Sequence, residues 1–153
     1  MFQLNNDNNF ARLDYQILIR GSVKSYRDNQ SLEKDIAWLQ SENYQFKRFD
    51  CENWTDKETM YDDLHTQFDF PAYFGRNYDA LQESLNEEEI QDNGLTVVFY
   101  NFDRVPAKTA HTLLDIFSHS SRHHLIFGKR LLLLIRIGED FKTEPFGSFS
   151  LNW

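Results

Sequence analysis

The sequence predicts an α/β domain, because short apolar runs of strand length alternate with longer segments of helical periodicity. The apolar runs lie at residues 15–20, 44–49, 95–102 and 131–137. The chain has 153 residues, of which 41% are hydrophobic and 14 are Phe, so it can fill the core of one domain. No internal repeat, low-complexity run or linker divides the chain, and we expect residues 1–153 to form a single domain.

The first third of the chain predicts a strand, a helix and a second strand. Residues 15–20 have the pattern of a strand that Gly21 ends, and residues 31–40 carry apolar side chains at helical spacing, with Ser31 as the N-cap. Residues 44–49 return as a strand. We expect these three pieces to form one βαβ unit with a right-handed parallel crossover.

Two further helices are predicted in the middle of the chain. Residues 57–68 have an apolar stripe, and residues 55–58 have the capping-box pattern that begins a helix. This helix ends before Pro71, because Phe70 precedes a proline and therefore avoids helical angles. The next helix is expected at about residues 76–86.

The last third of the chain predicts a strand, a helix and a final strand. Residues 95–102 are apolar on both faces and are expected in the centre of the sheet. Residues 105–123 have helical periodicity, with Pro106 tolerated in the first turn, and residues 131–137 form the last strand. The tail, residues 138–153, is rich in aromatic side chains and is expected to pack back on the body.

The charge of the chain is unevenly distributed. The net charge is −8, but residues 50–92 contain thirteen acidic and two basic residues, a net charge of −11, so the rest of the chain carries +3. Direct nucleic-acid binding needs a basic surface, and the negative charge of this chain therefore disfavours such binding. The asymmetry favours a basic protein partner, although acidic residues also serve solubility alone.

The sequence gives three indications of the compartment. No apolar run approaches the roughly 20 residues that cross a bilayer, so we expect no membrane association. The first nine residues lack the basic start and the apolar stretch of a secretory signal. Cys51 is the only cysteine, which excludes an intrachain disulfide and fits a reducing cytoplasm; we expect it to be a small buried side chain and not a nucleophile.

Three carboxylates follow each other on the helix expected at residues 76–86 and its continuation. Asp79, Glu83 and Glu87 stand at i, i+4 and i+8, which places them on one helix face. Like charges at this spacing cost a few tenths of a kcal/mol per pair. The spacing therefore favours a binding face, while the alternative is that Asp79 caps the helix and Glu83 is an ordinary surface acid.

The segment Phe70–Leu85, FPAYFGRNYDALQESL, resembles the binding helix of the barstar family, the intracellular inhibitors of secreted ribonucleases such as barnase. The matching elements are Pro71, Tyr73, Phe74, Gly75, Asn77, Asp79, Ala80, Leu81 and Glu83. The order of the predicted elements agrees over residues 44–137. The resemblance implies a three-layer fold with a small parallel sheet of about four strands and about four helices. Residues 14–43 would then be an added N-terminal βα unit.

The resemblance also implies a function and a site. Asp79 and Glu83 match the acids that enter the nuclease active site, and Tyr73 matches the aromatic residue beside it, although a core position is equally open for Tyr73. The partner would be a basic ribonuclease or nuclease toxin, the chain an immunity protein and a monomer, and no cofactor or metal is implied. The candidate partner-binding residues are Tyr73, Asn77, Asp79, Gln82, Glu83, Asn86 and Glu87, followed by Gly75, Arg76 and His119. We expect Gly75, through unusual backbone angles, and Asn77 mainly to shape the loop and the helix start.

The sequence also departs from the family pattern. Gln82 stands where the best-known member has a tryptophan, and Glu83 is one methylene longer than the aspartate there. Arg76 stands where a Glu is familiar, and His119 falls where an acidic contact is expected. The following loop, residues 86–92, is more acidic. These differences predict a different partner of the same class.

Two other classes of function remain open. Asp79 and Glu83 could serve as the acid and base of a hydrolase, but the chain has no phosphate-binding glycine loop and no nucleophile signature. The chain could also be a barstar-fold interaction module with a basic partner that is not a nuclease. A metal at His119, His123 and His124 is a less favoured reading, because no cysteine or obvious carboxylate ligand accompanies them.

Overall fold

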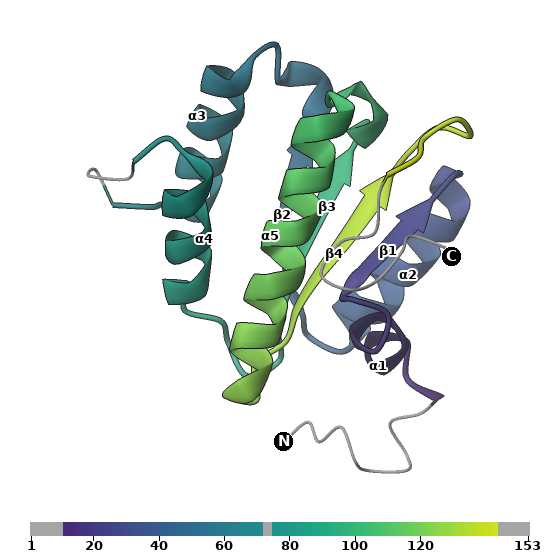
Figure 1. Cartoon of the computed structure of the whole chain (residues 1–153). Coiled ribbons are helices and arrows are strands. Elements are labelled where there is room, and N and C mark those ends of the chain that lie inside the picture. Colours follow the sequence, from purple (N-terminus) through teal and green to yellow (C-terminus); the bar gives the residue numbers. More distant parts are fainter. Residues whose placement is uncertain (1–10, 72–74, 144–153) are drawn as a thin grey trace.

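The fold is built on a parallel β-sheet (Figure 1). The computed structural model describes residues 11–71 and 75–143. Four strands pair in the order β1-β4-β3-β2, and every pair is parallel. The strands are β1 Val23–Tyr26, β2 Gln45–Asp50, β3 Leu95–Tyr100 and β4 Leu131–Arg136.

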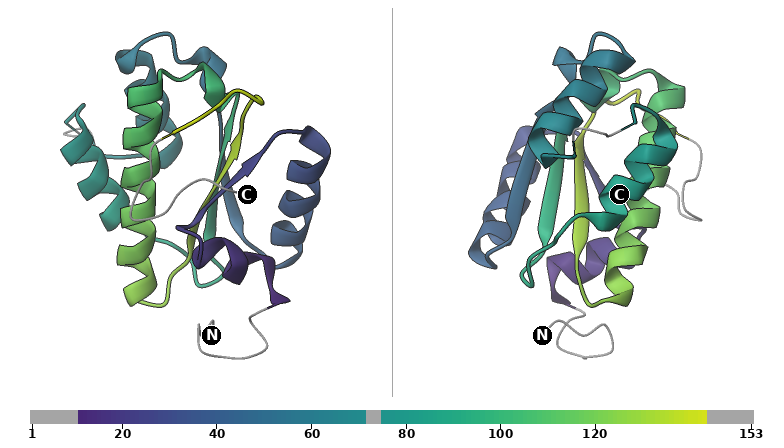
Figure 2. Two further views of the ribbon diagram at one scale, coloured as in Figure 1. Left: turned by 45° about the vertical axis from the view of Figure 1, so that its right-hand side comes forward. Right: turned by 90° about the vertical axis from the view of Figure 1, so that its left-hand side faces the viewer.

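Helices cover both faces of the sheet, so the molecule has three layers (Figure 2). The helices are α1 Leu13–Leu18, α2 Asn29–Ser41, α3 Lys57–Phe68, α4 Tyr78–Glu87 and α5 Ala107–Ile126. Alternate side chains of β4 serve the two faces: Leu132 and Leu134 contact α1 and α2, while Leu133 and Ile135 belong to the core under α3, α4 and α5. The predicted α/β fold with three layers is confirmed. None of these helices combines the length and apolar character needed to span a membrane.

The two central strands are β3 and β4, as their apolar sequences predict. Residues 95–99 and 131–135 are all buried. Both strands have neighbours on each side and helices above and below, so no side chain in these runs faces solvent. This double burial explains why neither strand shows an alternating pattern.

The predicted strand at residues 15–20 is wrong, because most of these residues belong to helix α1. The chain turns at Gly21 and Ser22, whose φ angles are positive at 86° and 70°, and the strand follows as β1. A short apolar run cannot be assigned to helix or strand by periodicity alone. The true strand contains Lys24 and Ser25, which conceal it in the sequence.

The predicted βαβ unit is present as β1, α2 and β2, with residues 23–26 in place of 15–20 as its first strand, and its two parallel strands lie at opposite edges of the sheet. The connection through α2 carries the chain across the whole sheet on one face. The chain then returns from β2 to β4 with its helices on the other face (Figures 1 and 2). The chain crosses the sheet in one direction on the first face and in the opposite direction on the second face. All the connections therefore have the same handedness, as parallel crossovers do.

Two helices begin with an aspartate that differs from the predicted cap. Asp28, and not Ser31, caps α2: its carboxylate accepts the backbone N–H of Ser31 at 2.7 Å. Asp56, and not Thr55, caps α3 and forms a capping box with Thr59. An Asp carboxylate satisfies the free N–H groups of a helix start as well as a Ser or Thr hydroxyl, so both residue types compete for this role.

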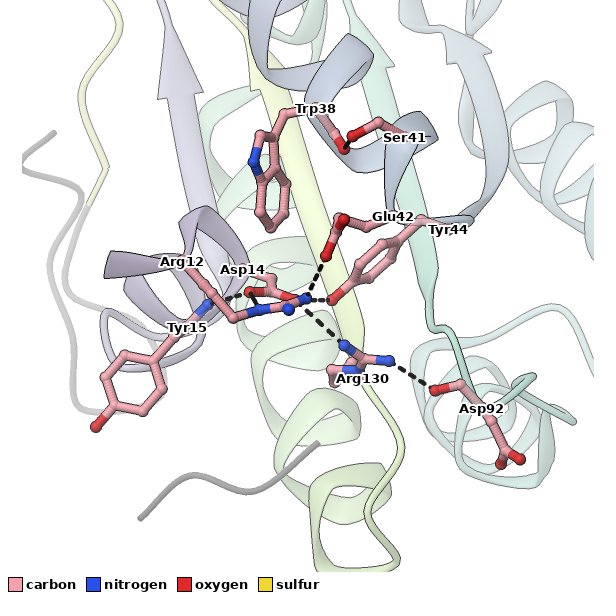
Figure 3. Close-up of polar contacts among 9 residues, drawn as sticks. All are labelled: Arg12, Asp14, Tyr15, Trp38, Ser41, Glu42, Tyr44, Asp92 and Arg130. Carbon is pink, nitrogen blue, oxygen red and sulfur yellow. Dashed lines mark hydrogen bonds and ion pairs between the residues drawn. The ribbon is translucent and has the colours of Figure 1, made fainter. Parts of the chain in front are cut away.

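A buried polar network joins α1 to the rest of the molecule (Figure 3). The side chain of Asp14 is fully buried, and its carboxylate accepts two hydrogen bonds from Arg12 at 3.0 Å, one from the Tyr44 hydroxyl at 2.6 Å and one from Arg130 at 3.2 Å. Arg130 also donates to the carbonyl oxygen of Asp92 at 2.7 Å. Burial raises the pKa of Asp14, but the hydrogen bonds outweigh it and the pKa lies below its ordinary value. The network thereby connects α1 to the starts of β2 and β4.

The beginning of the tail packs on the body, as expected. The ring of Phe141 lies 5.7 Å from that of Phe102, centroid to centroid. The other large apolar residues of the tail, Phe146, Phe149, Leu151 and Trp153, lie outside the described residues. Cys51 is buried as predicted, and burial raises the pKa of its thiol.

Candidate functional site

Helix α4 begins at a well-defined cap. Asn77 has an extended backbone, and its side-chain oxygen accepts the N–H of Ala80 at 2.8 Å. The expectation that Asn77 shapes the helix start is confirmed. Asp79 therefore falls in the first turn, where the helix dipole stabilises a negative charge.

Helix α4 has a buried face and an acidic one. Leu81 and Leu85 are completely buried in the core shared with α5. Asp79, Glu83 and Glu87 are exposed, as their spacing predicts. We call these three residues the acidic face. Within the described residues, no basic side chain forms an ion pair with any of the three, so their charges are available to a partner.

Two amide side chains border the acidic face. Gln82 donates a hydrogen bond to the side-chain oxygen of Asn86 at 3.1 Å, one helical turn later. Both side chains are half-buried. The bond holds the two amides in one arrangement, which lowers the entropy that a partner would have to remove.

The basic residue at the start of this segment is turned toward α3. Arg76 forms an ion pair with Asp62 and donates to the carbonyl oxygen of Glu58 at 3.4 Å. Gly75 is exposed, and its φ angle involves Phe74, which lies outside the described residues, so the unusual backbone angle expected there stays a prediction.

Two other candidate residues remain, Tyr73 and His119. Tyr73 lies outside the described residues. His119 is exposed on α5, where its Nδ1 atom lies 3.0 Å from the backbone oxygen of Asp115 and 3.4 Å from its carboxylate. His119 therefore has an acidic neighbour on its own helix.

His124, which the sequence suggested only as a less favoured metal ligand, fixes the end of α4. His124 is buried, and its Nε2 atom lies 2.7 Å from the carbonyl oxygen of Leu85. Burial lowers the pKa of His124, which favours the neutral ring. The burial of His124 could have been predicted from the sequence, because residue 124 follows the buried Phe117 by seven positions and so lies on the same helix face.

The negative charge of residues 50–92 lies on the surface. Eleven of the thirteen acidic residues are exposed, and only Asp63 and Glu88 are half-buried. Lys57 and Arg76, the two basic residues of the segment, are exposed as well. The segment therefore presents a negative potential that attracts cationic surfaces.

The arrangement does not resemble an enclosed catalytic site. Asp79 and Glu83 stand exposed on a helix, whereas acid–base pairs usually act in a cleft that excludes water. In residues 11–71 and 75–143, no group of three or more His, Cys, Asp or Glu side chains is placed to hold a metal ion.

Two comparisons relate this chain to known proteins. The sequence pattern of the family described as Barstar (barnase inhibitor) matches residues 44–135, from the residue before β2 to the next-to-last residue of β4. A protein of Bacillus subtilis (strain 168), named "Putative ribonuclease inhibitor YrdF", is 46% identical over 46 residues, which is 30% of this chain. That match spans about half, 48%, of the relative's own length.

Proposed function

Because the chain belongs to the barstar (barnase inhibitor) family, we propose that it inhibits a ribonuclease by covering the enzyme's active site with the acidic face of α4. The observation that carries this proposal is the alignment of Asp79, Glu83 and Glu87 on the exposed side of a helix whose other side is anchored in the core. Family membership supports an inhibitor and not an enzyme.

The inhibition follows from imitation of the substrate's charge. A ribonuclease binds the phosphates of RNA with Arg, Lys and His side chains, and carboxylates can occupy the same positions. Asp79 and Glu83 are one turn apart, so both can face one concave basic site. The RNA is then excluded by competition, and the inhibitor supplies no cofactor or reacting group.

The surrounding negative charge sets the rate of association. Opposite charges on two surfaces raise the rate of encounter, and salt screens this effect. The exposed acids of residues 50–92 extend this attraction well beyond α4. We therefore propose that a basic nuclease toxin is the partner, that the chain is its immunity protein, and that it acts in the cytoplasm.

The partner is expected to differ from barnase in detail. Glu83 carries a longer side chain than the family's aspartate, and Gln82 replaces an aromatic contact with an amide held by Asn86. Such changes alter the depth and shape that the enzyme must match.

The decisive experiment measures inhibition by the full chain. Basic proteins captured from the organism that encodes this chain, together with barnase as a defined probe, are assayed for RNA cleavage with the wild type and with Asp79→Ala/Glu83→Ala. We expect the double variant to lose at least about 30-fold in affinity. Truncating a buried charge pair costs about 2–5 kcal/mol, a magnitude taken in part from barnase and barstar themselves.

A matched control separates local contact from total charge. Glu139→Ala/Asp140→Ala removes two exposed carboxylates from the segment after β4 and leaves α4 intact. This variant should inhibit nearly as well as the wild type. If no ribonuclease is inhibited, or if both double variants weaken binding equally, the chain does not act through the acidic face. Capture of a basic protein without nuclease activity would favour an interaction module instead.

A further inference from the structure

A hollow lies beyond the last turn of α4. It has a volume of about 470 Å³ and is formed by the segment that leads from α4 to β3 and by the carboxyl end of α5. Figure 1 shows this segment passing the end of α5. Its lining includes Asn86, Glu88, Glu89, Ile90, His123 and Phe127. The hollow thus combines carboxylates with aromatic and aliphatic surface.

The hollow continues the acidic face of α4. Asn86 lines it, and Asn86 lies three residues after Glu83 and seven after Asp79, so all three share one side of the helix. A molecule that covers Asp79 and Glu83 therefore approaches the mouth of the hollow. The proposed contact surface does not end at the last turn of α4.

Phe127, which lines the hollow, is one of two consecutive exposed apolar residues. In the described part of the chain the large hydrophobic side chains with substantial exposure are Ile19, at 45%, Ile126, at 79%, and Phe127, at 68%. Two of these three are consecutive residues at the end of α5. The ring of Phe127 lies 5.5 Å from that of His123 at an interplanar angle of 62°, so the two rings form an aromatic wall. Aromatic side chains that are exposed in the free protein often anchor interfaces.

The carboxylates of the hollow differ in their pairing. Asp92 forms an ion pair with Lys129, so its charge is compensated. Glu88 is half-buried, and burial raises the pKa of its carboxyl group. The described structure gives Glu88 no ion pair, and Glu89 likewise remains unpaired there. The positive charge of Lys47 acts on Glu88 without forming an ion pair with it, so a cation placed in the hollow would lie beside the carboxylates of Glu88 and Glu89 and the side of an aromatic ring.

We propose that this hollow is a second contact of the inhibitor and that it binds an arginine side chain of the protein covered by α4. A guanidinium satisfies both features of the hollow, because it bonds to carboxylates and stacks on aromatic rings. The identity of the partner rests on the proposed function, whereas the chemistry of the hollow can be tested on the chain alone.

The test is a titration of the isotope-labelled full chain, followed by NMR, with N-acetyl-arginine-N′-methylamide. The matched control is N-acetyl-citrulline-N′-methylamide, which has nearly the same shape and no charge. We expect saturable shifts at Glu88, His123 and Phe127 with the arginine compound and clearly weaker binding of the citrulline compound. Phe127→Leu keeps an apolar side chain but removes the ring, and Glu88→Gln removes the charge. Each should weaken arginine binding by about 2- to 30-fold.

Three results would overturn the proposal: shifts that do not saturate, equal binding of the two compounds, or unchanged binding by Phe127→Leu and Glu88→Gln together. Sedimentation equilibrium supplies a further check, because a concentration-dependent dimer that Phe127→Ser abolishes would make the apolar pair a self-association surface. Glu139→Gln, an acid outside the hollow, should bind arginine like the wild type. Asp79→Ala/Glu83→Ala should also leave this titration unchanged, so failure of the inhibitor proposal and failure of the hollow can be distinguished.

Discussion

The Nε2 atom of His124 lies 2.7 Å from the carbonyl oxygen of Leu85 and ties the last turn of α4 to α5. The carbonyl oxygen can only accept, so Nε2 carries the hydrogen. The same oxygen accepts the backbone N–H of Glu88 at 3.2 Å. The end of the acidic helix is therefore held from inside the core, and this contact positions Asn86 and Glu87 at the surface.

We expect His124→Ala to destabilise the protein by about 1–3 kcal/mol, because it removes a buried hydrogen-bond donor and leaves a space in the core. Urea unfolding near pH 7.5 measures this change. His119→Ala, at an exposed position of the same helix, serves as the control and should change stability by no more than about 0.5 kcal/mol. Equal effects of the two substitutions would show that the contact with Leu85 contributes nothing.

Stability should also fall in mildly acidic solution because of His124. Its pKa is lowered in the folded protein, so the unfolded chain binds a proton more readily than the folded one. Above a pH of about 6.5 both states are neutral and His124 has no effect; below it, stability falls until the pH passes the folded pKa. His124→Gln keeps a donor but cannot titrate. The difference in unfolding free energy between wild type and this variant should therefore shift against the wild type from pH 7.5 to pH 5.5. A constant difference would contradict the assignment.

The central strands could be predicted from their continuous apolar runs, and helices α2 to α5 and the acidic face from their helical periodicity. Leu131–Arg136 is apolar on both faces since two helical layers cover it, and Asp79, Glu83 and Glu87 repeat with the period of the helix. The fold around α1 was not predictable in this way. Residues 15–20 are apolar enough for either a strand or a helix, and the order of the strands depends on contacts across the whole chain.

Contacts between residues that are far apart in the sequence could not be predicted either. Asp14 and Arg130 are separated by 116 positions, and no local sequence pattern indicates that the carboxylate of Asp14 is buried against the guanidinium of Arg130. His124 was visible as a buried helical position, but its partner on α4 was not. Sequence periodicity specifies which face of an element is buried, and only the assembled fold specifies what it is buried against.

The network around Asp14 should be essential for stability. Asp14→Asn removes the charge that compensates the buried Arg130, and we expect a loss of about 3–5 kcal/mol. Glu42→Gln is a suitable control: Glu42 pairs with Arg12 at 3.0 Å but is about one-third exposed, so its loss should cost about 0–1 kcal/mol. Chemical unfolding of both variants measures the difference. If Asp14→Asn costs no more than Glu42→Gln, the network does not hold α1 in place.

The ion pair between Arg76 and Asp62 leads to a prediction about association that rests on the proposed function. Both side chains are substantially exposed, so Arg76→Ala should lower stability by less than about 1 kcal/mol. The substitution removes one of the two positive charges of residues 50–92 and makes the surface around α4 more negative. Association with a basic nuclease should then be faster at low ionic strength, and the gain should disappear as salt is added, because the Debye length falls to about 10 Å at 0.1 M. Stopped-flow measurements at several salt concentrations test this expectation.

Lys142→Ala, which makes the same change in net charge outside the acidic segment, should accelerate association less. Slower association of Arg76→Ala would instead mean that Arg76 itself contacts the partner, and equal acceleration by both variants would mean that only the total charge matters.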